Sequence, residues 1–267
     1  MYPVESSSVI FHFTNQENLL GILKNNFLPK WGLEDLTCIL PGSPDAWTES
    51  ENYIYAFPKV CFCDIPLSRV AKHMSRYDNY GIGLTKDWAK LNGINPVIYV
   101  NSGSRVAEAV FGANKYLESS EIAHSNPLAE EEAASRRLEL ATKLYGQITI
   151  NKFTKPYEGP FGENDEIVRY YDEREWRYVP PYDPKQVQIY YKNVFESYSA
   201  DQIAELNNSL GPLVFEPNDI RYLIVRSEGE ILPLMDRLPE LKSRYDSSVI
   251  RLLTSRILAA DNIKQDV

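Results

Sequence analysis

One short segment, residues 171–180, concentrates side chains that could carry out chemistry: YDEREWRYVP. As a β-strand, this segment places Glu173, Glu175 and Arg177 on one face, because successive side chains point to opposite faces. One carboxylate can then pair with the guanidinium, while the other stays free to stabilise a developing positive charge. The alternative interpretation is an edge strand with a solvated charged face and with Trp176 in the core.

His12 lies in an apolar run at residues 9–13 that predicts a short strand. Thr14 begins the sequence T-N-Q-E, which has the spacing of a helix capping box, so we expect a helix directly after this strand. The imidazole could therefore point into a cleft at the start of the helix. A hydrogen-bonded structural histidine is the alternative explanation.

Two tyrosines three residues apart, Tyr77 and Tyr80, precede or begin the strand expected at residues 80–84. They could form a stacking platform for a planar ligand, or a turn with packed tyrosines. The chain contains 18 Tyr, and either Tyr-rich strands or a ligand-lining role would account for this number.

The sequence carries no recognisable motif for a metal or a phosphate-bearing cofactor. The histidines His12, His73 and His124 lie far apart. Cys61 and Cys63 have C-x-C rather than C-x2-C spacing, and no second pair follows. There is no G-x-x-x-x-G-K-[ST] loop, no G-x-G-x-x-G after a strand and no G-x-S-x-G. We therefore expect no metal site, and we interpret both cysteines as buried structural residues.

Composition and charge limit the class of protein. The 267 residues include 28 Lys+Arg and 37 Asp+Glu, which gives a net charge of −9, and 43% of them are hydrophobic. This composition is typical of a folded globular chain, and the charge does not favour nonspecific binding of duplex nucleic acid. There is no apolar run of about 18 residues and no secretory leader, so we expect a cytoplasmic protein that does not enter a membrane.

The hydrophobic periodicity mixes strands and helices without a regular βαβ alternation, so we expect the α+β class. Strands are expected at residues 9–13, 60–65, 80–84, 96–100, 148–153, 173–179, 187–191 and 222–225, and helices at 16–24, 68–74, 128–145, 200–209 and 229–243, with others after 85 and after 247. Residues 32–53 and 155–165 are expected to be loops. No linker divides the chain, so we expect a single domain over residues 1–267, with a helical insertion at about 126–146 and a C-terminal helical extension at about 229–267.

The order of these segments resembles the AbiGi family of abortive phage-infection proteins. The residues that carry the resemblance are FHFTNQENLLGIL, then VCFCDIPL, then RYDNYGIGLTKDWA with NGINPVIYV, then EREWRYVP. They cover roughly residues 9–100 and 168–180. The resemblance implies a role in phage defence, either as a toxin or as an antitoxin.

A strand histidine at the front and a strand glutamate late in the chain also resemble the ADP-ribosyltransferase superfamily. That resemblance implies a split antiparallel β core, with peripheral helices, that clamps NAD as a substrate. His12 would then hold the ribose side, with Thr14 near it. Some members have a Ser on the middle strand, where this chain has Cys61 and Cys63.

The same resemblance implies roles for four more residues. Tyr77 and Tyr80 would be the aromatic candidates that stack on nicotinamide. Glu175 would be the catalytic glutamate, and Glu173 the earlier member of an E-x-E pair. No metal is implied, because the loss of neutral nicotinamide leaves a positive charge that a carboxylate can stabilise.

Three functions follow from the sequence. The first is an NAD-dependent ADP-ribosyltransferase that modifies a nucleic-acid or protein acceptor. The second is a catalytically inactive antitoxin-like module that binds a cognate toxin protein through an acidic, Tyr-rich surface. The third is a nucleic-acid-handling protein, because an enzyme that touches a base only transiently need not be basic overall.

Overall fold

The computed structural model describes residues 7–39, 53–122, 143–161, 166–181 and 189–265. Its strands are β1 (Val9–Thr14), β2 (Lys30–Asp35), β3 (Ile54–Cys63), β4 (Tyr80–Thr85), β5 (Asn95–Pro96), β6 (Ile98–Val100), β7 (Thr154–Pro156), β8 (Gly159–Phe161), β9 (Glu166–Val168), β10 (Glu175–Tyr178), β11 (Tyr190–Tyr191), β12 (Ile220–Val225) and β13 (Ile257–Ala259). Its named helices are α1 (Gln16–Asn25), α2 (Ala71–Tyr77), α3 (Lys86–Leu91), α4 (Arg105–Ile122), α6 (Lys192–Glu196), α7 (Ala200–Asn208), α8 (Ile231–Leu241), α9 (Ser247–Thr254) and α10 (Ala260–Gln265), with short 3-10 turns η1 (Thr37–Ile39), η4 (Leu67–Arg69), η6 (Tyr170–Glu173) and η7 (Glu228–Glu230). The α+β class predicted from the sequence is confirmed.

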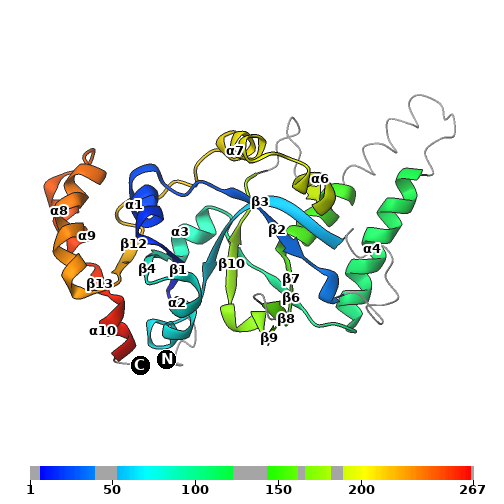
Figure 1. The fold of residues 1–267 in the computed structure, drawn as a ribbon, viewed down its shortest axis with the longest axis horizontal. Coiled ribbons are helices and arrows are strands. Elements are labelled where there is room, and N and C mark those ends of the chain that lie inside the picture. Colours follow the sequence, from blue (N-terminus) through cyan, green and yellow to red (C-terminus); the bar gives the residue numbers. More distant parts are fainter. Residues whose placement is uncertain (1–6, 40–52, 123–142, 162–165, 182–188, 266–267) are drawn as a thin grey trace.

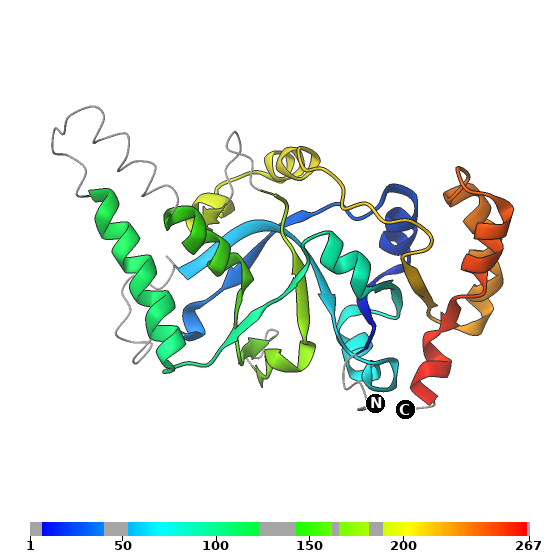
Figure 2. The ribbon, with the colours of Figure 1, turned by 180° about the vertical axis from the view of Figure 1, so that it is seen from behind.

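A mixed sheet forms the centre of the molecule (Figure 1). Its strands follow the order β13-β12-β4-β1-β3-β10-β5, and β2 and β11 also pair with β3. Neighbours are antiparallel except β12 and β13, which are parallel. Helices α8–α10 lie at one end of the molecule and α4 lies at the other, as the views from both sides show (Figures 1 and 2).

The sheet opens between β1 and β3. All six residues of β1 pair with β4, whereas the pairing of β1 with β3 among the described residues is the single pair Phe11↔Cys63. The side chain of His12 spans the gap beyond this pair, because its Nδ1 lies 2.8 Å from the carbonyl oxygen of Cys61. A side-chain hydrogen bond therefore continues the connection where the backbone ladder stops.

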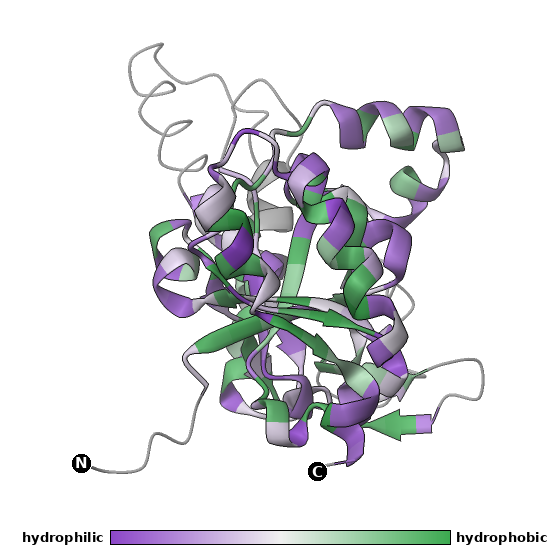
Figure 3. Ribbon diagram, turned by 90° about the vertical axis from the view of Figure 1, so that its left-hand side faces the viewer, coloured by the Kyte–Doolittle hydropathy of each residue, from purple (hydrophilic) through white to green (hydrophobic). Residues whose placement is uncertain are grey.

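The side chains of β1 alternate between two hydrophobic cores on the two faces of the sheet. Ile10 joins the larger core, to which α1, α3, α8 and α9 contribute, while Phe11 and Phe13 join the core under α2. A Cβ at Gly81 would lie 2.9 Å from the Phe13 ring, and one at Gly83 would lie 2.7 Å from the Phe11 ring. The G-x-G spacing of β4 thus serves close packing. Figure 3 shows the central strands as mostly hydrophobic.

The expected loop at residues 32–53 is wrong in its first part, because β2 occupies residues 30–35 and pairs with the first half of β3. Trp31 is its buried residue, and it packs against Ala56 and Phe195. The other residues of β2 are exposed or half-buried, so the strand has little need for alternating polar and apolar residues. Its sequence therefore does not show the alternation that predicts a strand. Residues 40–52 lie outside the described residues.

The strand expected at residues 148–153 is also wrong, because residues 143–153 are helical. Three buried amides explain the difference. Gln147 donates to Asn151 one helical turn later at 2.9 Å, and Asn151 donates to Asn114 of α4 at 3.0 Å. These contacts outweigh the strand preference of the β-branched residues in the segment. Most of the helix expected at residues 128–145 lies outside the described residues.

The C-terminal residues complete the main sheet as well as covering it. β13 adds a parallel strand beside β12, with Leu223 opposite Ile257. Helices α8 and α9 bury Leu234, Leu238 and Leu253 in the larger core. Within the described part of the chain, none of the helices has the length and apolar character that crossing a membrane requires.

Replacement of Gly83 tests the packing of β4 against β1. We expect Gly83→Ala to lower the free energy of unfolding by about 1–3 kcal/mol, because the new methyl group overlaps the Phe11 ring. Gly21→Ala is the matched control: no atom lies within 4 Å of its Cβ position, and Ala favours the helix. Urea unfolding of both variants measures the difference, and equal stability of Gly83→Ala and the wild type would contradict the assignment.

Candidate active site

β10 lies inside the sheet between β3 and β5, and its two faces differ as the sequence predicts. Glu175 and Arg177 on one face are 5% and 0% exposed. Trp176 and Tyr178 on the other face pack against the larger core. The alternative of an edge strand with a solvated charged face is wrong, since β10 has a partner on each side and its charged face is buried.

Glu173 lies just outside the strand, at the end of η6, so the expected strand at residues 173–179 is too long at its start. Arg174 separates the two elements with φ 45° and ψ 50°, a left-handed conformation that non-glycine residues seldom adopt. Its carbonyl oxygen accepts a hydrogen bond from the backbone N–H of Asp64 at 3.0 Å. This turn brings Glu173 and Glu175 together from two different elements.

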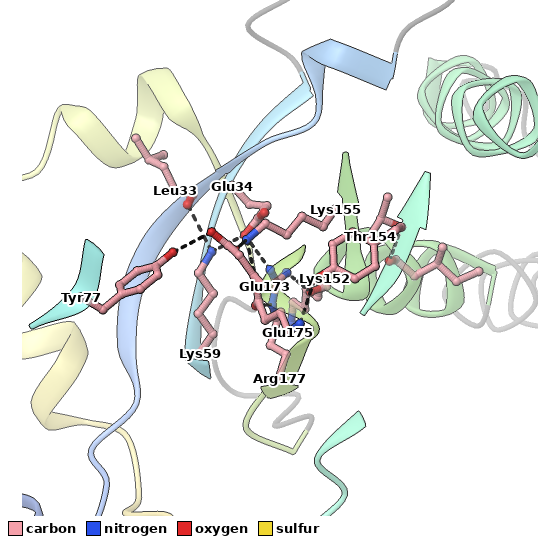
Figure 4. A network of polar contacts seen from close by, with 12 residues as sticks. Leu33, Glu34, Lys59, Tyr77, Lys152, Thr154, Lys155, Glu173, Glu175 and Arg177 are labelled. Atoms are coloured by element: carbon pink, nitrogen blue, oxygen red, sulfur yellow. Dashed lines mark hydrogen bonds and ion pairs between the residues drawn. The ribbon is translucent and has the colours of Figure 1, made fainter. Parts of the chain in front are cut away.

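Arg177 is the centre of a buried polar network (Figure 4). Its Nε donates to Oε1 of Glu175 at 2.7 Å, and its Nη2 donates to Oε2 of Glu34 on β2 at 2.9 Å. Its Nη1 donates to the carbonyl oxygen of Lys152 at 2.6 Å, near the end of helical residues 143–153. One guanidinium thus connects β10 to β2 and to a helix terminus.

Lys155 of β7 bridges the two glutamates of the E-x-E pair. Its Nζ lies 2.7 Å from Oε2 of Glu173 and 2.7 Å from Oε2 of Glu175. The hydroxyl of Tyr77 donates to the other oxygen of Glu173 at 2.9 Å (Figure 4). The expected pairing of one carboxylate with Arg177 is therefore confirmed, with Glu175 as that carboxylate, but neither glutamate is left free as the sequence predicts.

The network balances three carboxylates with three cations, the third cation being Lys59, which lies 2.6 Å from Glu34. Burial alone would raise the pKa of Glu34 and Glu175. Arg177 and Lys155 outweigh it at both carboxylates, with Lys59 adding to the effect at Glu34, so both pKa values lie below the usual range. Burial also opposes the charge of Lys155 and Arg177, and here the carboxylates prevail and raise both pKa values. These two carboxylates and two cations are therefore ionised together.

Sequence reasoning missed the residues Glu34, Lys59 and Lys155. Glu34 and Lys155 lie in segments expected to be loops, and Lys59 lies just before the expected strand. Ion pairs between residues 18 to 143 positions apart have no local pattern. The one local signal for these three residues is that each is a charged residue close to an apolar run.

A pocket of about 320 Å³ lies at the opening of the sheet, above this network. It is lined by Phe11, His12, Phe13, Glu34, Lys59, Cys61, Phe62, Cys63, His73, Tyr77, Lys155, Glu173 and Glu175. Four of the six site residues predicted from the sequence are among them: His12, Tyr77, Glu173 and Glu175. They come from β1, α2, η6 and β10.

The other two predicted residues lie elsewhere. The hydroxyl of Thr14 accepts a hydrogen bond from the side chain of Asn18 at 3.1 Å, at the start of α1. Tyr80 is buried, and its hydroxyl donates to Glu230 at 2.9 Å. The structure does not bring either side chain to the lining of the pocket.

His12 is held in one orientation. Its ring meets the rings of Phe27 and Phe62 edge to face, and its Nδ1 faces the carbonyl oxygen of Cys61. Burial lowers the pKa of His12, so the ring is neutral, Nδ1 carries the proton and Nε2 is an acceptor. Both interpretations of His12 from the sequence are therefore correct: the ring is hydrogen-bonded, and it also lines the pocket.

Aromatic rings and thiols form the rest of the lining. The rings of His73 and Tyr77 lie 4.6 Å apart, and Phe13 meets His73 at 5.7 Å. Burial raises the pKa of Cys61 to about 12, helped by the nearby charge of Glu175. Burial likewise raises the pKa of Cys63 above its usual value. Both thiols therefore stay protonated, which fits a structural rather than a nucleophilic role.

No group of three or more metal-ligating side chains occurs among the described residues that could hold a metal ion. The pocket instead offers an ionised carboxylate, an ammonium group, a neutral imidazole acceptor and aromatic rings. Such a set can bind a polar ligand with a planar ring and can stabilise a positive charge that develops beside Glu175.

Comparison with known proteins decides the family. Residues 47–226, about two thirds of the chain, match the family described as "Putative abortive phage resistance protein AbiGi, antitoxin". This chain belongs to the AbiGi family. It is also similar to the "Abortive phage resistance protein AbiGi" of Lactococcus lactis subsp. cremoris, with 29% identity over 263 residues that cover 90% of this chain and 99% of the relative. No solved structure matches the chain.

The resemblance to the AbiGi family seen in the sequence is thus confirmed. The family match includes Tyr77, Lys155 and the residues of β10, while His12 and Glu34 precede it. The similarity to the Lactococcus protein extends over almost the whole chain. The residues that line the pocket therefore come from the matched segment and from the part that precedes it.

Replacement of Arg177 tests the buried network. We expect Arg177→Met to lower the free energy of unfolding by about 3–5 kcal/mol, because it leaves buried carboxylates without their main partner. Arg169→Met is the control, since Arg169 and Asp172 form a largely exposed pair and its loss should cost at most about 1 kcal/mol. Urea unfolding at neutral pH measures both values.

Arg177→Met should also change how the free energy of unfolding depends on pH. The folded-state pKa values of Glu34 and Glu175 lie below their unfolded values, so their contribution is complete above about pH 5 and is lost as the pH falls through the folded-state values. The wild type should therefore lose more stability than Arg177→Met between about pH 6 and about pH 3. Parallel loss in the two proteins would show that Arg177 does not set these pKa values.

Proposed function

We propose that this AbiGi-family protein acts in phage defence as an NAD-dependent ADP-ribosyltransferase on a macromolecular target. One observation supports the proposal above all: His12, Tyr77, Glu173 and Glu175, from distant parts of the sequence, line one pocket at the opening of the sheet. These are residues to which the resemblance to ADP-ribosyltransferases gives roles. A pocket of about 320 Å³ is of the size that holds the nicotinamide and ribose end of NAD.

In the proposed reaction, the bond between ribose C1′ and the nicotinamide nitrogen breaks. Nicotinamide leaves as a neutral molecule with the bonding electron pair, and the ribosyl carbon becomes oxocarbenium-like. A nucleophilic atom of the acceptor then attacks this carbon, and its proton passes to solvent. Glu175 opposes the developing charge, as carboxylates do in glycosidases, and its lowered pKa keeps it ionised.

Arg177 and Lys155 hold Glu175 in different ways. Arg177 is fully buried and contacts Oε1 from within the same strand, so it fixes the carboxylate. Lys155 contacts Oε2 and lines the pocket. In the proposed complex, the ribose approaches Oε2, and the flexible ammonium group keeps its second partner, Glu173.

His12 and Tyr77 position the substrate in this proposal. Nε2 of His12 accepts a hydrogen bond from a ribose hydroxyl, because Nδ1 already faces Cys61. The paired rings of Tyr77 and His73 give the nicotinamide ring an aromatic wall. Both side chains act by orientation and leave the charge stabilisation to Glu175.

Replacement of Glu175 tests the enzyme. We expect Glu175→Gln and Glu175→Asp each to reduce NAD turnover by at least about 100-fold, because the first removes the charge and the second withdraws it by one methylene. Glu175→Asp keeps the charge beside Arg177 and Lys155, so it guards against a simple loss of folding. Exposed Glu17→Gln is the control.

Turnover is measured as NAD consumption by the purified protein and as transfer of labelled ADP-ribose to lysate material, with thermal unfolding followed in parallel. Normal turnover by folded Glu175→Asp would refute the catalytic role. If the folded wild type neither binds nor consumes NAD with or without lysate, the transferase proposal fails.

A second candidate function is that of an antitoxin that binds a toxin protein. The family description includes the word antitoxin. In addition, both oxygens of Glu175 are already paired, which suits a carboxylate with a structural role. In this case the pocket would have no catalytic role, and a surface of the protein would bind the toxin.

Growth distinguishes the two candidates. An active transferase expressed alone should slow growth of its host, and Glu175→Asp should relieve this effect while the protein accumulates to the same level. An antitoxin should be harmless alone and should restore growth to cells that express a toxin encoded beside it. Growth curves with matched immunoblots measure both effects.

A further inference from the structure

A second pocket, of about 250 Å³, adjoins the first and shares His73 and Glu173 with it. It is lined by residues of η4, α2 and η6, together with Ile65, Pro66 and Arg174. This second pocket therefore lies beside the proposed NAD site, and Glu173 lies between the two pockets. Nothing in the proposed NAD chemistry uses the residues that belong to this pocket alone.

Four cations line this second pocket. Arg69, Lys72 and Arg76 follow each other at spacings of three and four, so they lie on one face of the η4–α2 segment. Arg174 comes from the other wall, where its left-handed conformation separates it from Glu173 and Glu175. Arg69, Lys72 and Arg174 are exposed to solvent.

The charges of this pocket are not balanced within the described part of the chain. None of the four cations forms an ion pair with a described residue. The two acidic residues of the lining are paired: Asp172 with Arg169 at 3.1 Å, and Glu173 with Lys155 at 2.7 Å. The chain has a net charge of −9, but this pocket is positively charged. Its four cationic side chains can therefore each contact an anionic group of a ligand.

Exposed aromatic rings accompany these cations. Tyr171 lines the pocket, is 49% exposed, and stacks on Tyr157 with ring centroids 5.5 Å apart and the rings inclined by 29°. Phe161 is 39% exposed, and the Arg76 guanidinium lies 5.2 Å from its ring centroid. Tyr77, which lines the first pocket and donates to the shared Glu173, is 40% exposed. These three rings therefore leave aromatic surface accessible beside the cations.

We propose that this second pocket binds a single-stranded nucleic acid, with the cations on its phosphates and Tyr171 against a base. Unpaired cations interleaved with exposed aromatic rings are the combination by which proteins hold single strands. A duplex is a poor fit, because its stacked bases present no face to the rings. This proposal rests on the proposed function in one respect: the bound strand would be the acceptor, delivered beside Glu173 to the first pocket.

Fluorescence anisotropy with labelled 12-mers of DNA, RNA and duplex DNA tests the binding without any NAD. We expect the single strands to bind and the duplex to bind at least about 10-fold more weakly. Four phosphate contacts predict about a 50-fold loss of affinity for a single strand between about 50 and about 200 mM salt. The DNA and RNA arms show which sugar is preferred.

Arg69→Gln/Lys72→Gln should reduce that salt-dependent loss to about 7-fold, because two phosphate contacts remain. Lys24→Gln/Arg251→Gln is the matched control, since it makes the same change of net charge on exposed helix positions away from the pocket. Tyr171→Leu should weaken binding about 10-fold, while Tyr171→Phe, which keeps a ring, should not. Equal behaviour of the two double variants would overturn the proposal.

Two further outcomes separate this proposal from the proposed function. The wild type should bind single strands in the absence of NAD, whether or not the protein turns over NAD. If no single strand binds at about 50 mM salt, and Arg69→Gln/Lys72→Gln instead weakens binding of NAD alone, the cations serve the pyrophosphate of the dinucleotide and the nucleic-acid proposal is wrong.

Discussion

A buried guanidinium cannot be left without partners, and Arg177 meets this requirement by joining parts of the chain that lie far apart. Its partners are Glu175 on its own strand, Glu34 on β2 and the end of a helix at Lys152. Lys155 and Glu173 extend the same network to β7 and η6. The relative positions of these elements are therefore set by ionic hydrogen bonds as much as by apolar packing, and the pocket above them takes its floor from this network.

The opening of the sheet supplies the other half of the site. β1 is anchored on one side by its full pairing with β4, where glycines allow the Phe11 and Phe13 rings to approach closely. On the other side it meets β3 at the pair Phe11↔Cys63. The imidazole of His12 reaches across the gap, so a residue that connects the two strands also lines the pocket. A rigid frame around a local gap is the usual way to hold a preorganised site.

The sequence was most informative where the signals that fix a segment are local. The strand at residues 80–84 was predicted almost to its ends, because its short apolar run is buried. The helix at 200–209 was predicted equally well, and a capping box at Ser199 marks its start. The clustering of Glu173, Glu175 and Arg177 was also predictable. What local patterns could not supply was the cation between the glutamates, since Lys155 reaches them only through the fold. The amide contacts that turn residues 148–153 into a helix are equally invisible locally.

Arg174 divides the two pockets. Its side chain lines one pocket, while Glu175, the next residue, lines the other. Substitution at this position can therefore alter one pocket without touching its neighbour. A change in length cannot do so, since one residue more or less between Glu173 and the strand would displace both walls at once. Over evolution, the residues of the two pockets can therefore change independently, whereas an insertion or deletion between Glu173 and the strand would affect both pockets together.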